Sequence, residues 1–196
     1  MKGSSIALLV FLSWAAAQSL SAAAETAAAD IPQTSDAVHR GAETVTNVCL
    51  ACHSLKYLKY SDLLELGFSG KEVDSLRKRK SLKESLQTDM APDMLRESFG
   101  TLPPDLSLMA KARDGGPRYI YGLLTGFYQN VDGTVDNHLF PGIKMPDVLN
   151  FSGAKDSAQR APLEAQARDA AAFLNWAADP HAEERRRRTR PALMSQ

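Results

Sequence analysis

Six segments of the chain combine the apolar spacing and the flanking residues that favour helices. They are residues 36–51, 61–66, 87–100, 108–113, 118–127 and 162–178. In the first segment Ala37, Gly41, Val45 and Val48 recur every three or four positions, which places them on one face of a helix. The pattern predicts an all-α domain with long loops between its helices.

Residues that start, stop or disfavour helices refine this prediction. Ser35 or Asp36 can cap the first helix, and Pro162 lies near the first turn of the last one, which Asp179-Pro180 ends. Gly41 lies on an apolar helix face, where glycine costs about 1 kcal/mol relative to alanine. A close crossing with another helix would explain that glycine, so we expect one there.

Residues 128–151 form a long irregular stretch that contains Asp132-Gly133 and Met145-Pro146. Such a loop inside a compact domain is usually functional or disordered. Its apolar residues Phe140, Ile143 and Leu149 argue against disorder. We therefore expect an ordered loop with a functional role.

The chain begins with a pattern typical of a secretory signal peptide, residues 1–24. Lys2 precedes the apolar run 6–12, and Ala22-Ala23-Ala24 offers a cleavage site of small residues. The run falls short of the roughly 20 apolar residues that span a bilayer, although an uncleaved N-terminal anchor stays an alternative. Either reading predicts export to the periplasmic or intermembrane-facing side.

Basic and acidic residues balance over the whole chain, with 23 of each, but they are unevenly distributed. Residues 25–182 carry 17 basic and 21 acidic side chains, and residues 183–196 carry five arginines. We therefore expect a signal peptide (1–24), one domain (25–182) and a basic tail (183–196). A second basic run, residues 77–80, is either a solvated helix face or a docking patch for an acidic partner.

The sequence Cys49-Leu50-Ala51-Cys52-His53 carries the clearest chemical signal. Two thiols separated by two residues, with a histidine directly after the second, form the attachment sequence of a c-type haem. Each thiol can add to one vinyl group of the porphyrin, and His53 then lies under the iron as its proximal ligand. The motif predicts one covalently attached haem c.

Other readings of these cysteines stay open. A structural zinc site needs about four ligands, and the other histidines, His39, His138 and His181, are scattered. A redox-active Cys-x-x-Cys is favoured by a preceding strand of a βαβ unit, and nothing before Cys49 reads as a strand. A disulfide between Cys49 and Cys52 is the default in an oxidising compartment.

Several blocks of sequence together carry a family resemblance. They are Arg40-Gly41 leading into the haem motif and Ser54; Leu102-Pro103-Pro104-Asp105-Leu106-Ser107 with Lys111-Ala112-Arg113; Tyr119-Ile120-Tyr121-Gly122-Leu123-Leu124-Thr125-Gly126; Phe140-Pro141-Gly142-Ile143-Lys144-Met145-Pro146; and Phe173-Leu174-Asn175-Trp176-Ala177-Ala178-Asp179-Pro180. They cover most of residues 40–185 and resemble cytochrome c1, the haem subunit of quinol:cytochrome c oxidoreductase (the bc1 complex). The proline and Met-Pro blocks are the specific ones, because all c-type cytochromes share the haem motif.

The resemblance implies a cytochrome c-type fold around one haem, and a one-electron carrier of the respiratory chain rather than an enzyme. It implies that Met145 is the distal iron ligand, that Arg113 and Tyr119 contact the haem propionates, and that Pro104 packs near the ring. It further implies cytochrome b or an iron–sulfur protein as donor and a soluble cytochrome or oxidase as acceptor, with no nucleic acid.

The residues alone leave the role of Met145 open, because core packing is the usual role of a methionine. The other methionines that could serve are Met90, Met94 and Met109. A thioether opposite His53 would saturate the iron and favour Fe(II). His138 in that position would instead give a low-potential bis-histidine site.

The end of the chain bears on how it would reach a membrane. Members of the resembled family continue into a C-terminal membrane helix, whereas this sequence stops at Gln196, so we expect a form lacking that anchor. The tail arginines could then provide peripheral membrane association. The alternatives are a free periplasmic electron shuttle, or a haem enzyme or gas sensor with an open iron position.

Overall fold

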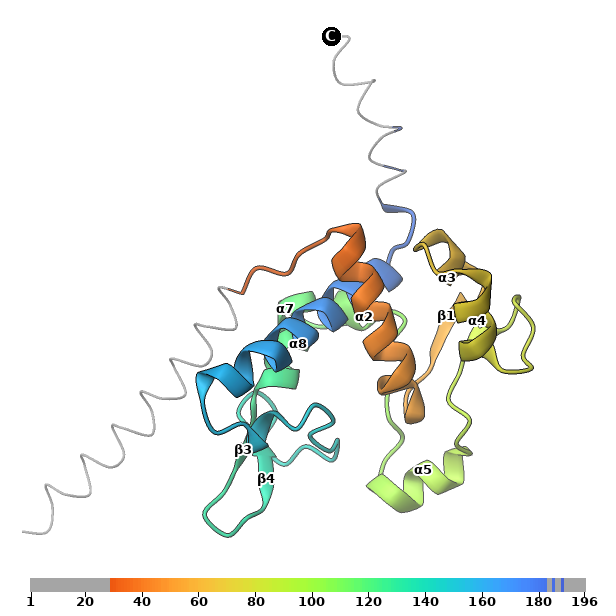
Figure 1. The fold of residues 1–196 in the computed structure, drawn as a ribbon. Coiled ribbons are helices and arrows are strands. Elements are labelled where there is room, and N and C mark those ends of the chain that lie inside the picture. The colour runs from red at the N-terminus through yellow and green to blue at the C-terminus, as the bar shows by residue number, and fades with distance from the viewer. Residues whose placement is uncertain (1–28, 183–184, 186–187, 189–196) are drawn as a thin grey trace, which may run out of the picture.

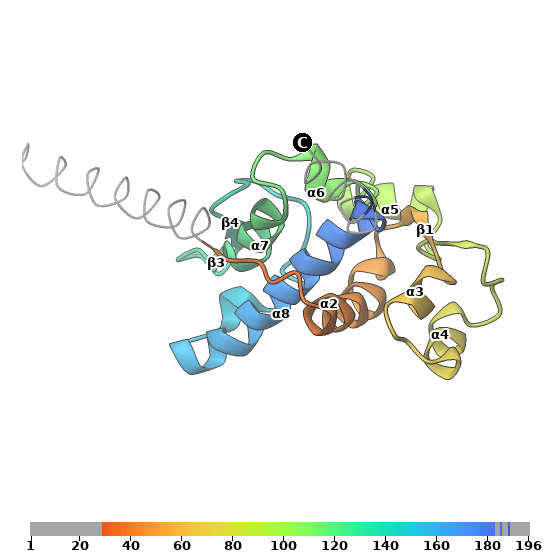
Figure 2. The same cartoon turned by 90° about the horizontal axis from the view of Figure 1, so that it is seen from above.

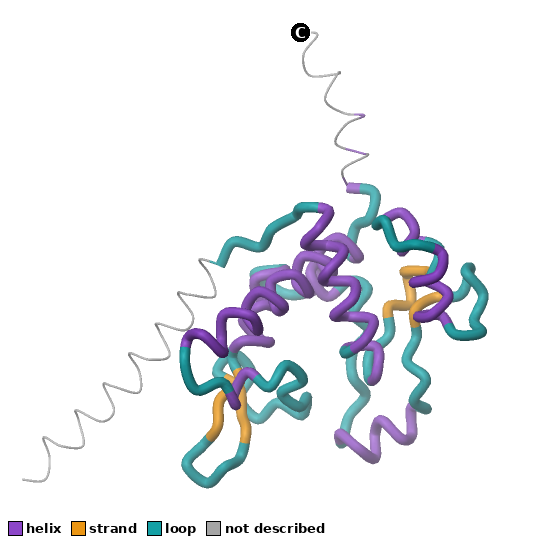
Figure 3. Tube along the Cα trace, viewed as in Figure 1, coloured by secondary structure: helices purple, strands orange, loops and turns teal. Residues whose placement is uncertain are grey.

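Helices dominate the fold, which confirms the all-α prediction (Figures 1 and 3). The structure, a computed structural model, describes residues 29–182, 185 and 188. Its elements are α2 (Ser35–Asn47), α3 (Asp62–Glu65), α4 (Gly70–Arg77), α5 (Pro92–Phe99), α6 (Met109–Ala112), α7 (Pro117–Thr125), α8 (Ser157–Ala177) and the 3-10 turns η1 (Cys49–Ala51) and η2 (Phe151–Gly153). The predicted signal peptide (1–24) and most of the predicted tail (183–196) lie outside the described residues. In the described ranges, no helix is both long and apolar enough to cross a bilayer.

Two short antiparallel strand pairs accompany the helices and were not predicted. β1 (Leu55–Lys59) pairs with β2 (Ser85–Leu86), and β3 (Phe127–Gln129) pairs with β4 (Val135–Asn137). The second pair is a hairpin that begins at Phe127 and continues into the stretch 128–151, which the sequence predicts to be irregular. The predicted helix 118–127 instead ends at Thr125, so its predicted end was wrong. Strands of two to five residues are too short to give a clear period-two signal, which is why the pattern missed them.

Helices α2 and α8 cross at the centre of the molecule, at Gly41 (Figures 1 and 2). A Cβ atom on Gly41 would lie 1.9 Å from the backbone oxygen of Asp169 and 2.8 Å from Cβ of Phe173. The close crossing expected from the sequence is therefore confirmed. Beside it, Arg40 donates through Nε and Nη2 to the Asp169 carboxylate at 2.6 and 3.0 Å, which binds the same two helices.

The apolar core connects this crossing to the segment that follows the cysteine motif. Phe173 of α8 is fully buried, and Leu55 and Leu58 of β1 and Leu63 of α3 belong to the same apolar cluster. The motif is thus followed directly by a strand that the core fixes in place.

The start of α8 differs from the prediction. The helix begins at Ser157, and the side chain of Asp156 caps it by accepting a hydrogen bond from the N–H of Gln159 at 2.9 Å. Pro162 lies inside the helix and not near its first turn, so the predicted start was wrong. Because proline has no N–H group, Pro162 cannot donate to the carbonyl of Ala158. Both residues are exposed, so water can bond that carbonyl instead.

Helix α2 is shorter than predicted and differs at both ends. Thr34 is its N-cap, accepting a hydrogen bond from the N–H of Ala37 at 3.3 Å, in place of Ser35 or Asp36. The helix ends at Asn47, and the chain tightens into η1 through the first three motif residues. The sequence predicted one helix through residue 51; the motif instead forms a separate 3-10 turn.

Candidate functional site

The cysteine motif lies on the tight turn that follows α2. The backbone N–H groups of Cys52 and His53 both donate to the carbonyl of Cys49, at 3.1 and 2.9 Å. Both thiols are free and half-buried. Burial, and to a lesser extent the neighbouring Cys52, raises the pKa of Cys49 to about 12. Redox-active cysteines need a lowered pKa, so this environment disfavours a thioredoxin-like role.

The His53 ring is held by a backbone carbonyl 51 residues away. Its Nδ1 lies 2.7 Å from the carbonyl oxygen of Pro104. Because a carbonyl can only accept, Nδ1 carries the proton and Nε2 has the free lone pair. Burial lowers the pKa of His53, against the opposing effects of the Pro104 hydrogen bond and the Asp105 charge. A neutral imidazole with one nitrogen held and the other free is suited to bind a metal.

Pro104, which the resemblance places near the haem ring, contacts His53 through its backbone carbonyl, and the sequence did not reveal this contact. The segment around it also contains two residues that sequence reasoning missed. Asp105 accepts the backbone N–H of Lys56 at 3.0 Å, and buried Ser107 accepts that of Tyr57 at 3.1 Å. No sequence signal links partners about 50 residues apart.

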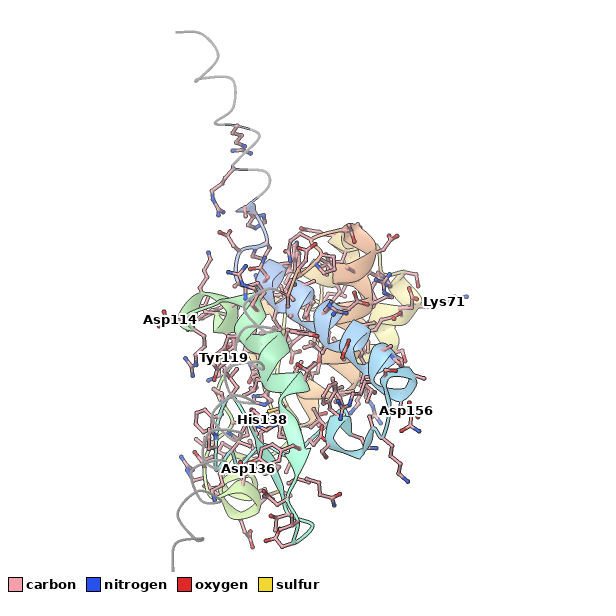
Figure 4. The ribbon with its side chains drawn as sticks, turned by 90° about the vertical axis from the view of Figure 1, so that its left-hand side faces the viewer. Lys71, Asp114, Tyr119, Asp136, His138 and Asp156 are labelled. Carbon is pink, nitrogen blue, oxygen red and sulfur yellow. The ribbon has the colours of Figure 1, made fainter. Side chains whose placement is uncertain are left out.

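Arg113 and Tyr119, the pair expected to contact propionates, lie next to each other. The guanidinium carbon of Arg113 is 6.0 Å from the centre of the Tyr119 ring. Arg113 is exposed after α6, and half-buried Tyr119 lies on α7, on the side of the molecule shown in Figure 4. A guanidinium beside a phenol provides the charged and neutral donors that a carboxylate accepts.

Met145 lies in an ordered loop, as the sequence predicted. It is half-buried and packs against the main apolar cluster, to which Cys49 and Leu50 of the motif also pack. The loop is pinned by side chains that accept backbone N–H groups. These bonds are Asn137 Oδ1 to Leu139 and Phe140 (2.9 and 3.1 Å), Asp136 Oδ1 to Gly142 (2.7 Å), and Asp147 to Phe151 and Ser152 (2.9 and 2.7 Å).

The other candidate ligands lie in different surroundings. Met94 on α5 is 56% exposed, whereas Met109 packs against the core cluster. The imidazole of His138 stacks on Tyr128, with ring centres 4.1 Å apart, and it lies below Tyr119 in the view of Figure 4. His138 is exposed, whereas Met145 packs against the same apolar cluster as Cys49 of the motif.

Two neighbouring carboxylates pair with three of the four basic residues in the run 77–80. Arg77 pairs with Asp74 at 2.7 Å, and Lys78 and Lys80 both pair with Asp89, at 3.0 and 2.6 Å. These pairs favour the interpretation of the run as part of the local structure over a docking patch, because three of its four cations already contact an acidic side chain.

The donor atoms present fit a c-type haem. Two free thiols, an imidazole with a free Nε2 and a half-buried thioether are the groups that such a haem takes from a protein. Within the part of the chain that the structure describes, no three side chains of His, Cys, Asp or Glu are grouped so as to hold a metal ion. A zinc site built from these residues is thereby disfavoured.

The sequence is similar to one protein family and to several known proteins. The family model described as "Cytochrome C1 family" matches residues 32–195. The chain is 30% identical over 177 residues to Arabidopsis thaliana "Cytochrome c1 1, heme protein, mitochondrial", covering 76% of this chain and 58% of that protein. It is 29% identical over 197 residues to Rhodospirillum rubrum "Cytochrome c1", covering 76% and 71%. It is 30% identical over 186 residues to the Candida albicans "Cytochrome b-c1 complex catalytic subunit, mitochondrial", covering 76% and 62%. The chain therefore spans only part of the length of these curated relatives.

Proposed function

The chain belongs to the cytochrome c1 family, and from that premise we propose that it is a one-electron carrier that holds one covalent haem c. Proteins of this family carry such a haem. We propose Cys49 and Cys52 as the attachment residues, His53 as the proximal ligand and Met145 as the distal ligand. Haem c, when bound, supplies an iron that changes between Fe(III) and Fe(II) by one electron.

The chain's own residues would bind and orient that group. The turn at residues 49–53 presents both thiols and His53 from one short segment, so the same segment would attach the haem and bind its iron. Arg113 and Tyr119 supply donors for the propionates. The loop that Asn137 and Asp136 hold through its backbone N–H groups would offer the Met145 thioether to the iron. With both His53 and Met145 as ligands, the iron would have no open position for a substrate.

One observation carries the proposal: the 2.7 Å contact between His53 Nδ1 and the Pro104 carbonyl. It joins the haem motif to the proline block, which are 51 residues apart. The contact fixes the imidazole tautomer so that Nε2 is the atom offered to a metal, and it increases the electron donation of the ring.

Partners and location follow from the family as proposals. We propose that the chain works in a quinol:cytochrome c oxidoreductase, accepting electrons from an iron–sulfur protein or cytochrome b and passing them to a soluble cytochrome or oxidase. The name of the Candida albicans relative, a b-c1 complex subunit, supports this. We further propose export directed by residues 1–24, a haem domain at 25–182, and salt-sensitive membrane association through the basic tail (183–196).

Covalent attachment can be tested directly. The chain, expressed with a haem-attachment system, should keep its haem through acidic organic extraction. The double variant Cys49→Ala with Cys52→Ala should lose it, whereas Ser54→Ala, a matched change next to the motif, should keep it. Acid-resistant haem in the double variant would overturn the attachment site and the proposed function with it.

A further inference from the structure

The segment that carries the Pro104 carbonyl has no regular structure of its own. Residues 101–108 lie between α5 and α6, outside any helix or strand. Pro103 and Pro104 have no N–H group, so they cannot donate a hydrogen bond that would hold the segment. The carbonyl of Pro104 nevertheless lies 2.7 Å from His53 Nδ1. Something next to Pro104 must therefore fix this backbone.

The residues directly after Pro104 provide that fixation. Asp105 uses both carboxylate oxygens: Oδ2 accepts the N–H of Lys56 at 3.0 Å, and Oδ1 accepts the N–H of Ser107 at 2.9 Å. The N–H of Leu106 donates to the carbonyl of Ser54 at 2.8 Å. The Asp105 carboxylate thus connects the segment that carries Pro104 to the segment that follows His53.

The irregular pairing of β1 explains why these acceptors are needed. The register with β2 shifts between Leu55 and Lys59, as at a β-bulge, which disturbs the regular ladder around Lys56 and Tyr57. The side chains of Asp105 and Ser107 accept the N–H groups of those two residues. Ser107 is almost completely buried, at 1% exposed, so the contact is part of the interior.

From this arrangement we infer that Asp105 is a positioning residue for the axial histidine. Its carboxylate locks residues 103–107 onto the start of β1 and thereby keeps the Pro104 carbonyl on His53 Nδ1. It sets both the orientation of the imidazole and the electron donation of Nε2. The inference rests on the proposed function, in which His53 is the proximal ligand, and adds a residue that the haem motif does not contain.

The substitution Asp105→Asn separates this role from simple packing. An asparagine keeps the shape but has only one acceptor oxygen, so one of the two backbone N–H groups loses its partner. It also removes a negative charge that acts on His53. Both changes reduce electron donation to the metal and favour Fe(II). At a fixed applied potential, the Fe(II) to Fe(III) ratio of the haem-loaded full chain should rise by up to roughly tenfold, the size expected if about one hydrogen bond's net contribution to Fe(III) is lost.

A matched control is Asp62→Asn. Asp62 Oδ2 also accepts a backbone N–H of β1, from Lys59 at 2.8 Å, and the charge change is the same. The ratio should stay within about twofold of the parent in this control. The ring-proton NMR shifts of His53 in the oxidised protein should move in Asp105→Asn and not in Asp62→Asn.

The outcomes distinguish this inference from the function on which it rests. A parent protein without covalent haem would defeat the proposed function. Haem-loaded Asp105→Asn that is less stable to urea but has the ratio and NMR shifts of Asp62→Asn would overturn the positioning role alone. If Asp105→Asn fails to hold haem, Asp105→Glu decides, because it keeps the charge but displaces the carboxylate from the N–H groups of Lys56 and Ser107. A smaller rise in the ratio supports the role, and an unchanged ratio overturns it.

Discussion

The side-chain amide of Asn137 donates to the backbone carbonyl of Leu123 at 2.8 Å and ties the Met145 loop to α7. Asn137 is completely buried, and its Oδ1 accepts the N–H groups of Leu139 and Phe140. One side chain thus bonds a carbonyl of α7 and two N–H groups at the start of the loop that carries the proposed distal ligand.

The change Asn137→Ala should therefore destabilise the fold by about 2–4 kcal/mol, because it leaves buried backbone groups without partners. Urea unfolding measures this loss, and hydrogen exchange should show faster exchange at Leu139 and Phe140. Asn130→Ala is the control, since Asn130 makes an exposed bond to Thr134 in the same hairpin. Equal losses in the two variants would contradict the role of Asn137.

Gly41→Ala should destabilise the protein by about 3 kcal/mol or more, although alanine is the better helix former. The added methyl would collide with the Asp169 backbone, which cannot move without shifting α8. Gly70→Ala on α4 is the control because a Cβ there meets nothing within 4 Å. Denaturant unfolding of both variants tests this, and a Gly41→Ala protein as stable as the parent would mean that the two helices do not cross so closely.

Met145→Ala should lower the midpoint potential on the order of 100 mV, within the range of about 0.8 V over which axial ligands tune haem. The physical reason is that Fe(II) loses its soft thioether. Redox titration measures the shift, and His138→Ala and Met94→Ala should leave the potential near that of the parent. An unchanged potential in Met145→Ala, together with a shift in His138→Ala, would reassign the distal ligand to His138.

The end of α8 should show a pH-dependent contribution to stability. Hydrogen bonds from Arg185 and Lys111 hold the pKa of Asp179 well below its usual range. A carboxyl whose pKa is lower in the folded protein stabilises the fold above its unfolded pKa, near 4, and this contribution is lost as the pH falls further. The melting temperature of the parent should therefore drop more steeply below pH 4 than that of Asp179→Asn. Parallel curves for the two proteins would contradict the pairing.

Local patterns in the sequence predicted much of the fold and of the site. The helical spacing of apolar residues predicted an all-α fold. The unfavourable glycine on the apolar face of the first helix predicted the close crossing at Gly41. Both signals are local, because they depend on one helix face and on one unfavourable residue. The start of α8 was missed because Pro162 was read as a residue of the first turn, although the Asp156 cap lies six residues earlier.

The contacts that complete the site could not be predicted, because they join residues far apart in the chain. Asp105 and Asn137 look like ordinary loop residues in the sequence. Asp105 bonds the backbone N–H of Lys56, and Asn137 bonds the carbonyl of Leu123. Only the fold brings these partners together. The pairing of β1 with β2 depends in the same way on a two-residue partner strand.

The central claim is that the iron is held on both sides and serves only to carry electrons. Exposure of the reduced, haem-loaded chain to carbon monoxide at neutral pH tests it most directly, because carbon monoxide binds ferrous haem only where a coordination position is open. With His53 and Met145 as ligands, the visible spectrum should not change on addition of the gas. Ready formation of a carbon monoxide complex by the folded protein would contradict the account and favour a haem enzyme or gas sensor.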